Sequence, residues 1–387
     1  MAIANQEGGL SVPRARWPSM IETFEELSSS SGNGVPSPQN LGHILPKTTH
    51  ERQQVSATDR SLDNDAHLPE KVVAHHLGEV GDRELPLEKT VLYLAYGSNL
   101  CSETFRGRRG IKPLSQINVI VPDLRLTFDL PGVPYIEPCF AATRFHDSTG
   151  EKEGSDKVEY NGLNGTTISV HSPLISGGTP GCNSNIPLVG VVYEVTLSDY
   201  ARIIATEGGG RGYEDKVVDC YPFPESYDAA DPIPELPITR PFKAHTLMSP
   251  IQVASVGTRK STFISNFGHL VRPNAQPSAR YLNLIETGAA EHDFPMAYRK
   301  HLSMVQPYRI TSLRQRIGKA VFLGTWGPLM LLVMGLSRSM ADIDGRSPGW
   351  LLSLGDYLFF GMWQSYDNVF SRIFGEGEKA TDHDDTR

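Results

Sequence analysis

Apolar and polar positions along the middle of the chain form short runs that are typical of β-strands. Residues 91–95 are an unbroken apolar run, and residues 117–130 alternate, with a bend expected at Pro122. Four further runs have the same character: residues 139–145, 188–196, 213–223 and 242–248. We therefore expect the central part of the chain to build a sheet.

Three segments place apolar residues at helical spacing. The first, residues 197–207, is expected to start near Ser198. The second, residues 277–292, starts at Pro277-Ser278, residues that favour a helix start, and is expected to break at Gly288. The third spans residues 295–305. Because strands come first and helices cluster late, an α+β fold is favoured over an alternating parallel sheet.

Composition divides the chain into three parts. Residues 1–89 are rich in Ser, Pro, Gln, Asn and charge without sustained periodicity, so we expect a mostly disordered extension. Residues 90–310 carry the predicted strands and helices of a globular domain. Within it, residues 146–186 are polar and glycine-rich, which predicts a long surface loop. Residues 311–387 form an apolar tail.

Two apolar runs dominate the tail. Residues 320–336 contain no charge and fall slightly short of the roughly 20 residues that span a bilayer. A second run, residues 349–363, contains Asp356. Tryptophans and basic residues surround these runs: Trp326, Trp350, Trp363, Arg309, Arg314, Arg316 and Lys319. The pattern fits membrane association through residues 320–363 with the globular domain in the cytosol, and equally a helical hairpin packed on the domain or on a partner.

Charge and cysteine usage exclude several classes of protein. The net charge of −8 in 387 residues argues against a nucleic-acid binder. Four scattered cysteines and the lack of an apolar leader near Met1 predict a reducing, cytoplasmic setting. The sequence shows neither a metal-spaced Cys/His cluster nor a phosphate-loop or GxSxG signature. We therefore expect no metal and no cofactor.

Three stretches are candidates for chemistry. Tyr96-Gly97-Ser98-Asn99 follow the first strand, and successive amides in such a turn can bind an anion, although an ordinary turn has the same composition. Glu207 ends a predicted helix, where the helix dipole disfavours a carboxylate; it is either a helix-end residue or a functional one. Tyr281 lies on the apolar side of a late helix, as a core or a pocket aromatic.

Together these stretches resemble the γ-glutamylcyclotransferase family. Residues 93–100 are similar to that family's substrate loop, residues 193–208 to the segment that ends in its catalytic glutamate, and residues 277–302 to its late helical segment. The resemblance covers residues 90–310 and implies a compact α+β fold around a small barrel-like sheet. The extended N-terminus and the apolar tail are similar to fungal members, some of which act in sulfur-containing toxin pathways.

The resemblance implies release of 5-oxoproline and a free amine from a γ-glutamyl amide, a small-molecule substrate. Glu207 would be the general base and then the general acid. Tyr213 would be a pocket tyrosine, although its spacing from Glu207 is one residue shorter than the family pattern. The implied substrate-binding residues are Tyr93, Leu94, Ala95, Tyr96, Gly97, Ser98, Asn99 and Tyr281.

Alternatives stay open at this point. A catalytically silent binder or a membrane-tethered adaptor could keep the same fold. The leaving amine could belong to an amino acid, a Cys-Gly conjugate or a bulkier metabolite, whereas intact glutathione is disfavoured because glutathione-specific cyclotransferases carry a different glycine-serine loop. The sequence contains no signal for the oligomeric state.

Overall fold

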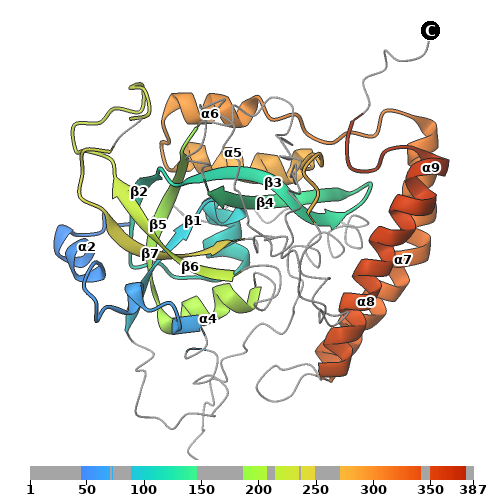
Figure 1. The fold of residues 1–387 in the computed structure, drawn as a ribbon, viewed down its shortest axis with the longest axis horizontal. Helices are drawn as coiled ribbons and strands as arrows, with labels where there is room; N and C mark the ends of the chain where they lie inside the picture. The colour runs from blue at the N-terminus through green and yellow to red at the C-terminus, as the bar shows by residue number, and fades with distance from the viewer. Residues whose placement is uncertain are drawn as a thin grey trace, which may run out of the picture.

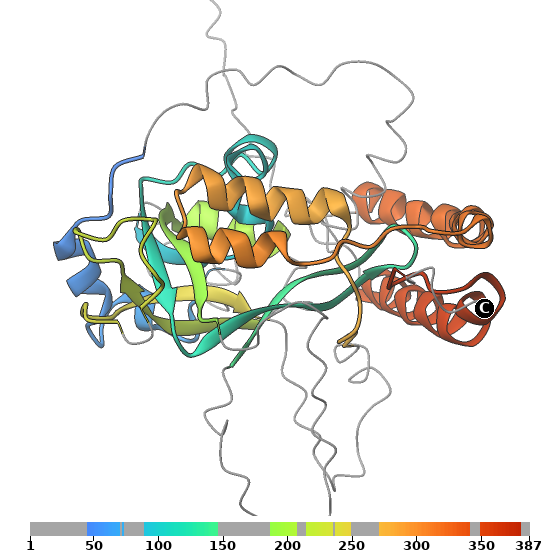
Figure 2. The same ribbon diagram turned by 90° about the horizontal axis from the view of Figure 1, so that it is seen from above.

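The computed structural model describes residues 45–69, 72, 89–145, 186–206, 214–234, 237–248, 271–340 and 349–380. Within these ranges a closed β-barrel is covered by helices, and a helical hairpin stands at one side of it (Figures 1 and 2). The mixed α+β fold with a small barrel is therefore confirmed. The expected loop insertion, apart from Ile186, lies outside the described residues.

Five strands close the barrel in the order β1-β5-β2-β6-β7. They are β1 (Thr90–Ala95), β2 (Ser115–Val121), β5 (Leu188–Thr196), β6 (Glu214–Pro222) and β7 (Phe242–Met248). Neighbouring strands are antiparallel except β1 and β7, which run parallel where Tyr93 lies opposite His245. Nearly every residue of β1 and β5 is buried, which explains their unbroken apolar runs.

A separate antiparallel ribbon of β3 (Leu124–Val133) and β4 (Glu137–Phe145) crosses the barrel toward the hairpin (Figure 1). The expectation of one strand bent at Pro122 is wrong, because β2 ends at Val121 and β3 belongs to a different sheet. Proline has no N–H to give to a strand ladder, so a turn at Pro122 ends the pairing of β2.

Helix α4 (Leu197–Thr206) follows β5 directly, as predicted. Helices α5 (Ala279–Glu291) and α6 (Met296–Ser303) lie side by side over the barrel (Figures 1 and 2). Ser278 caps α5 by accepting the N–H of Tyr281. The expected break at Gly288 is wrong: a single glycine costs a helix only about 1 kcal/mol, and α5 continues through it.

The tail forms an antiparallel pair of helices, α7 (Leu313–Ser339) and α8 (Gly349–Ser365), followed by the π-helical turn η5 (Tyr366–Phe370) and the short helix α9 (Ser371–Phe374). Hydrogen bonds join the tail to the ribbon, including one from the Tyr135 hydroxyl to Gly375 O at 2.8 Å. The Tyr135 N–H donates to Gly377 O at 2.6 Å, and Trp363 Nε1 donates to Gly132 O at 3.2 Å. The tail is thus attached to the end of β3 and to the turn that follows it.

Part of the N-terminal extension folds onto the barrel, so the prediction of disorder is wrong for residues 45–69. Helix α2 (His50–Ser56) and the 3-10 turn η1 (Leu62–Asn64) pack against β7. Periodicity did not reveal them because polar groups make much of the attachment. Except for Val72, the rest of residues 1–88 lies outside the described chain.

Asp63 is the centre of this attachment. Its side chain is buried, and its oxygens accept the Leu92 N–H at 2.6 Å and an Arg52 guanidinium N–H at 2.7 Å. Arg52 also pairs with Glu194 of β5 at 3.0 Å. These contacts join η1 and α2 to two neighbouring barrel strands, β1 and β5.

We predict that Asp63→Ala lowers the free energy of unfolding by about 3 kcal/mol, because it leaves the buried Leu92 N–H and part of Arg52 without an acceptor. Chemical denaturation followed by fluorescence measures the change. Asp59→Ala, at an exposed position of the same segment, is the control and should stay within about 0.5 kcal/mol of the parent. Equal effects of both substitutions would contradict the assignment.

Candidate active site

Strand β1 ends in the turn that the sequence singled out. Gly97 precedes a 3-10 turn, η2 (Ser98–Leu100), and a π-helical turn, η3 (Glu103–Arg108), follows. The Leu100 N–H donates to Gly97 O at 3.0 Å. N–H groups at the start of a helical turn have no partner within it. The turn after β1 can therefore offer backbone donors to a bound group.

A small cavity of about 20 Å³ adjoins this turn. It is lined by Tyr93, Tyr96, Gly97, Ser98, Asn99, Ala141, Leu247 and Tyr281. The lining comes from β1, the turn, β4, β7 and α5, so segments far apart in sequence meet here. No charged side chain is among these described residues. A ligand in the cavity would be held by hydroxyl groups, backbone dipoles and shape.

Tyr281 reaches the turn from the first part of α5. Its hydroxyl oxygen accepts the Ala141 N–H at 3.2 Å, and its ring meets Phe140 edge-on with centroids 5.1 Å apart. A Cβ on Gly97 would lie 3.4 Å from that oxygen. The absence of a side chain at Gly97 thus keeps the space in front of Tyr281 open.

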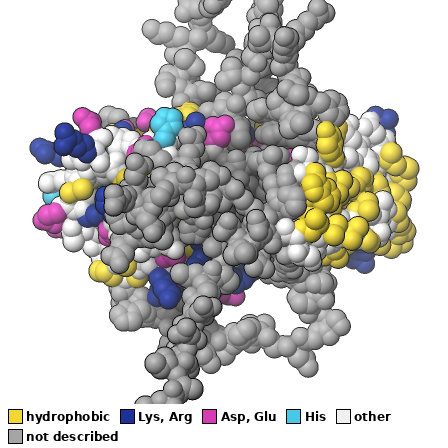
Figure 3. Space-filling view, turned by 90° about the horizontal axis from the view of Figure 1, so that it is seen from below, with side chains coloured by type: hydrophobic (Ala, Val, Ile, Leu, Met, Phe, Trp, Pro, Cys, Tyr) yellow, Lys and Arg dark blue, Asp and Glu magenta, His cyan; other side chains and the backbone are white. Residues whose placement is uncertain are grey.

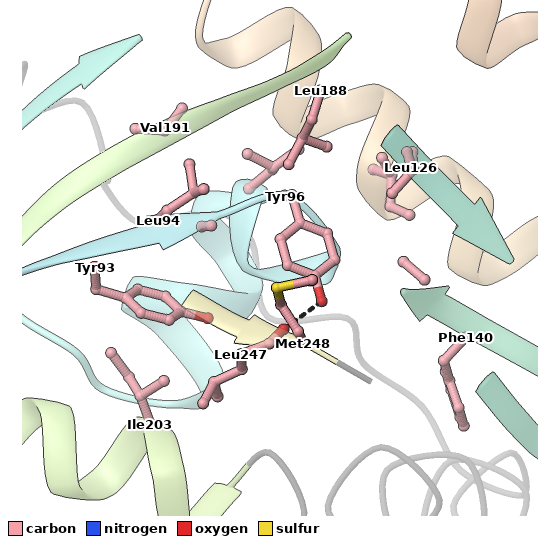
Figure 4. Close-up of a cluster of buried hydrophobic side chains, with 14 of the residues drawn as sticks. Tyr93, Leu94, Tyr96, Leu126, Phe140, Leu188, Val191, Ile203, Leu247 and Met248 are labelled. Carbon is pink, nitrogen blue, oxygen red and sulfur yellow. Dashed lines mark hydrogen bonds between the residues drawn. The ribbon is translucent and has the colours of Figure 1, made fainter. Parts of the chain in front are cut away.

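Two more tyrosines are fixed at the cavity by hydrogen bonds. The amide of Asn99 donates to the Tyr93 hydroxyl at 3.0 Å, and the Tyr96 hydroxyl donates to Leu247 O at 2.5 Å (Figure 4). Their rings are buried. The three tyrosines from β1, the turn and α5 form a wall whose hydroxyl positions are set by neighbouring elements.

Leu94 and Ala95 do not line the cavity. Leu94 packs in the core beside Leu188 and Val191 (Figure 4). Its Cδ1 would lie 2.7 Å from a Cβ on Gly190, so glycine at that position of β5 leaves the room for Leu94. The side chains of Leu94 and Ala95 are thus part of the core, and the predicted contact of these residues with the substrate, expected largely through the backbone, stays a prediction.

Glu207 and Tyr213 lie outside the described residues, which include Thr206 before them and Glu214 after them. The elements on either side are joined, because the Tyr200 hydroxyl of α4 donates to Asp215 of β6 at 2.6 Å. The ring of Tyr200 lies 6.4 Å from that of Tyr93, centroid to centroid. Helix α4, through Tyr200 in its first half, and the start of β6 are thereby tied to the strand that carries a cavity tyrosine.

A buried ion pair supports this connection. The Nδ1 of His245 lies 2.6 Å from Asp215 and its Nε2 lies 2.9 Å from Leu62 O. Both ring nitrogens can donate only in the imidazolium form. Burial lowers the pKa of His245, but the hydrogen bond and charge of Asp215 outweigh it and the pKa lies above its usual value. The charged pair joins β6, β7 and the N-terminal segment.

The second half of α5 packs against the turn after β1. A Cβ on Gly288 would lie 2.5 Å from Leu100 and 2.6 Å from the Cys101 nitrogen, so only glycine allows this approach. One turn later, His292 Nε2 lies 3.0 Å from Leu100 O and 2.8 Å from the Tyr193 hydroxyl. Burial lowers the pKa of His292, which favours its neutral form. The same helix therefore carries Tyr281 and supports the turn.

Sequence reasoning missed Ala141, Leu247 and the Asp215–His245 pair. No local motif marks them, since they reach the site through strand pairing between distant segments. Among the residues that the structure describes, no group of three or more His, Cys, Asp or Glu side chains could hold a metal ion.

Comparison with known proteins identifies the family. The chain is 31% identical over 289 residues to the γ-glutamyl cyclotransferase gliK of Aspergillus fumigatus, which covers 74% of this chain and 89% of that protein. It is also 31% identical over 297 residues to the γ-glutamyl cyclotransferase aclK of Aspergillus oryzae, covering 75% of this chain and 91% of the relative. The chain belongs to the γ-glutamyl cyclotransferase family. Cyclotransferase activity is thus assigned by homology, in preference to a silent binder.

Two further comparisons describe the parts of this cyclotransferase. A family model described as the AclK C-terminal domain matches residues 312–373, which contain the α7–α8 hairpin. A solved structure titled "Gamma-glutamyl cyclotransferase" is 17% identical, with a TM-score of 0.35, and covers 58% of this chain and 92% of its own.

We predict that Gly288→Ala destabilises the enzyme by about 1–3 kcal/mol and reduces its activity, because the added methyl group would push α5 away from Leu100. Gly324→Ala in α7 is a matched control. A Cβ there meets nothing within 4 Å, so it should stabilise the protein by up to about 1 kcal/mol. Thermal unfolding and 5-oxoproline release measure both variants. A Gly288→Ala enzyme as stable and active as the parent would disprove the close contact.

Proposed function

We propose that the enzyme holds a γ-glutamyl amide at the turn after β1 and converts it to 5-oxoproline and a free amine. The observation that carries this proposal is the cavity formed by the turn, Tyr93, Tyr96 and Tyr281. A γ-glutamyl group has an amine, a carboxylate and a carbonyl oxygen, which fit the backbone donors of Ser98 and Asn99 and the nearby hydroxyl groups. Contacts of these residues with the substrate are part of the proposal.

The reaction needs no nucleophile from the protein. The α-amine of the substrate attacks its own γ-carbonyl carbon, a five-membered ring forms, and the bond to the leaving nitrogen breaks. Because both reacting groups belong to one molecule, much of the orientation cost is removed in advance. The enzyme must fold the substrate into the cyclising shape and stabilise the oxyanion that develops on the carbonyl.

Two proton transfers remain, and we assign both to Glu207. The α-amine must lose a proton before it attacks, and the leaving nitrogen must gain one because an amide anion is a very poor leaving group. One carboxylate placed between the two nitrogens can accept the first proton and donate the second. The tie between Tyr200 and Asp215 supports this assignment, since it joins the two described elements that precede and follow Glu207 and Tyr213.

The substrate class is also part of the proposal. We propose a γ-glutamyl amino acid or a glutathione-derived conjugate, with only the γ-glutamyl group recognised at the turn. Mass spectrometry of a panel that includes γ-glutamyl-alanine, glutathione and S-conjugates of glutathione distinguishes these. Turnover of intact glutathione in preference to the others would contradict the proposed class.

We further propose that residues 90–310 are the catalytic unit and that it works in the reducing cytoplasm. Cys101, Cys139 and Cys220 are free and buried in the structure. Burial raises the pKa of the Cys139 thiol well above its usual value, which keeps it protonated and unreactive. Thiols of this kind serve packing and need no oxidising compartment.

We predict that Glu207→Gln lowers kcat by about 10²–10⁴-fold, because the amide can neither accept nor donate the transferred proton. Binding of a non-cleavable γ-glutamyl analogue should be nearly unchanged. Glu214→Gln is the control: Glu214 is exposed on β6 and pairs only with Lys216 at the surface among the described residues. Release of 5-oxoproline measures kcat, and an unchanged rate in the Glu207 variant would refute the role.

We predict that Gly97→Ala raises KM about tenfold or more while the protein stays folded. The new methyl group would lie 3.4 Å from the Tyr281 hydroxyl and 3.5 Å from Ala141 Cβ, which are ordinary contacts, but it would occupy the space proposed for the substrate. Gly107→Ala in η3, whose Cβ would lie 3.9 Å from its nearest neighbour, is the control. Steady-state kinetics compare the two, and equal KM values would exclude a substrate at Gly97.

A further inference from the structure

Helix α7 is apolar on two faces. One face is buried in the protein and includes Phe322, Met330 and Val333. The other is exposed and includes Val321, Leu329 and Leu332. A helix on the surface of a soluble protein ordinarily turns charged residues outward. Between Lys319 and Arg338 the sequence of α7 contains no charged residue.

Helix α8 extends the same exposed surface. Trp350 and Leu354 are exposed on it, while Met362 and Trp363 are buried. We define the apolar outer face as Val321, Leu329, Leu331, Leu332, Trp350 and Leu354. Figure 3 shows hydrophobic side chains gathered over the hairpin, with Lys or Arg side chains at the margin. A contiguous apolar surface with a basic rim is the signature of an interaction site.

Length and composition alone would permit α7 to cross a membrane. Residues Leu313–Leu336 reach a mean hydropathy of 1.6, and 28% of that window is buried. A core helix of a soluble protein passes the same hydropathy test, but it is mostly buried. The exposure of α7 therefore sets it apart from an ordinary core helix.

The position of the hairpin argues against a crossing. Its long axis runs along the flank of the barrel rather than away from it (Figures 1 and 2). A bilayer perpendicular to that axis would have to enclose the barrel beside it. Among the described residues, a bilayer parallel to the axis and on the side away from the barrel would meet the apolar outer face. At 27 residues, α7 would lie along the surface for about 40 Å.

Charge favours an anionic lipid surface as the occupant. Arg314 and Arg316 are exposed at the first turn of α7, and Lys319 follows them at the edge of the charge-free stretch. Exposed Arg309 precedes them. Basic residues at the edge of an apolar face bind anionic headgroups while the apolar side chains enter the acyl boundary. The whole chain has a net charge of −8, so an anionic surface would repel its other faces, and binding through this face also sets the orientation.

We propose that the α7–α8 hairpin is an in-plane membrane anchor, which lies on an anionic bilayer with its apolar outer face buried in the lipid. The ribbon of β3 and β4 is joined to the tail through the hydrogen bonds of Trp363 with Gly132 and of Tyr135 with Gly377. The catalytic domain is thereby held at the membrane surface. This inference does not depend on the proposed substrate or on Glu207.

Flotation of the full-length enzyme with vesicles of phosphatidylcholine and phosphatidylserine (3:1) tests the proposal. The parent should float with the vesicles, and Leu329→Glu combined with Leu332→Glu should reduce binding at least about tenfold. Val55→Glu combined with Ile238→Glu changes two exposed apolar residues outside the hairpin and is the matched control. It should bind as the parent does. Unchanged 5-oxoproline release in all variants shows that they are folded.

Other outcomes would overturn the anchor. The anchor would be disproved if the parent enzyme does not bind the vesicles. It would also be disproved if the Leu329→Glu/Leu332→Glu variant binds them as well as the control variant does. A parent dimer in light scattering that the hairpin substitutions dissociate would assign the face to a second copy of the chain. Resistance of bound enzyme to alkaline carbonate would indicate a crossing helix. Release by carbonate, together with weaker binding of Arg314→Glu/Arg316→Glu, is the expected result.

Discussion

The close approach of α5 to the turn after β1 is the contact on which the site depends. Gly288 allows the helix backbone to touch Leu100 and Cys101, and no other residue fits there. Two turns earlier in the same helix, Tyr281 faces Gly97 across the cavity. The distance between the turn and its tyrosine wall is therefore fixed by a rigid helix. Steric constraint, rather than many weak contacts, gives the site its shape.

Buried polar groups hold the remaining elements in register around this contact. Asp215 accepts hydrogen bonds from Tyr200 and His245, while Asp63 joins the N-terminal segment to β1. Each of these carboxylates is buried and has charged or hydrogen-bonding partners, as a low-dielectric interior requires. Because hydrogen bonds are directional, these networks fix how the elements are oriented around an otherwise apolar barrel. They explain how α4 and β6 are tied together beneath the tyrosines.

Much of this could be predicted from local patterns. Apolar runs located the barrel strands, and Ser278 marked the start of α5 correctly. The turn at Tyr96–Asn99 and Tyr281 were recognised from their motifs, and the structure brings them to one cavity. Prediction from residue patterns failed where a segment has no periodic apolar face. The polar residues of α2 and η1 concealed an ordered segment, and Pro122 was interpreted as a bend although it separates two sheets.

The sequence by itself determined the element types and the family, since both depend on short-range spacing of residue types. Only the tertiary structure decided which elements meet. Ala141 and Leu247 reach the cavity through strand pairing. The requirement for glycine at position 288 comes from the contact with Leu100, which lies 188 positions away in the sequence. The tertiary structure also decided that the apolar tail forms a helical hairpin at one side of the barrel, with apolar side chains exposed (Figure 1). The hydropathy of a helix depends only on which residues it contains, whereas the burial of each face depends on what packs against it.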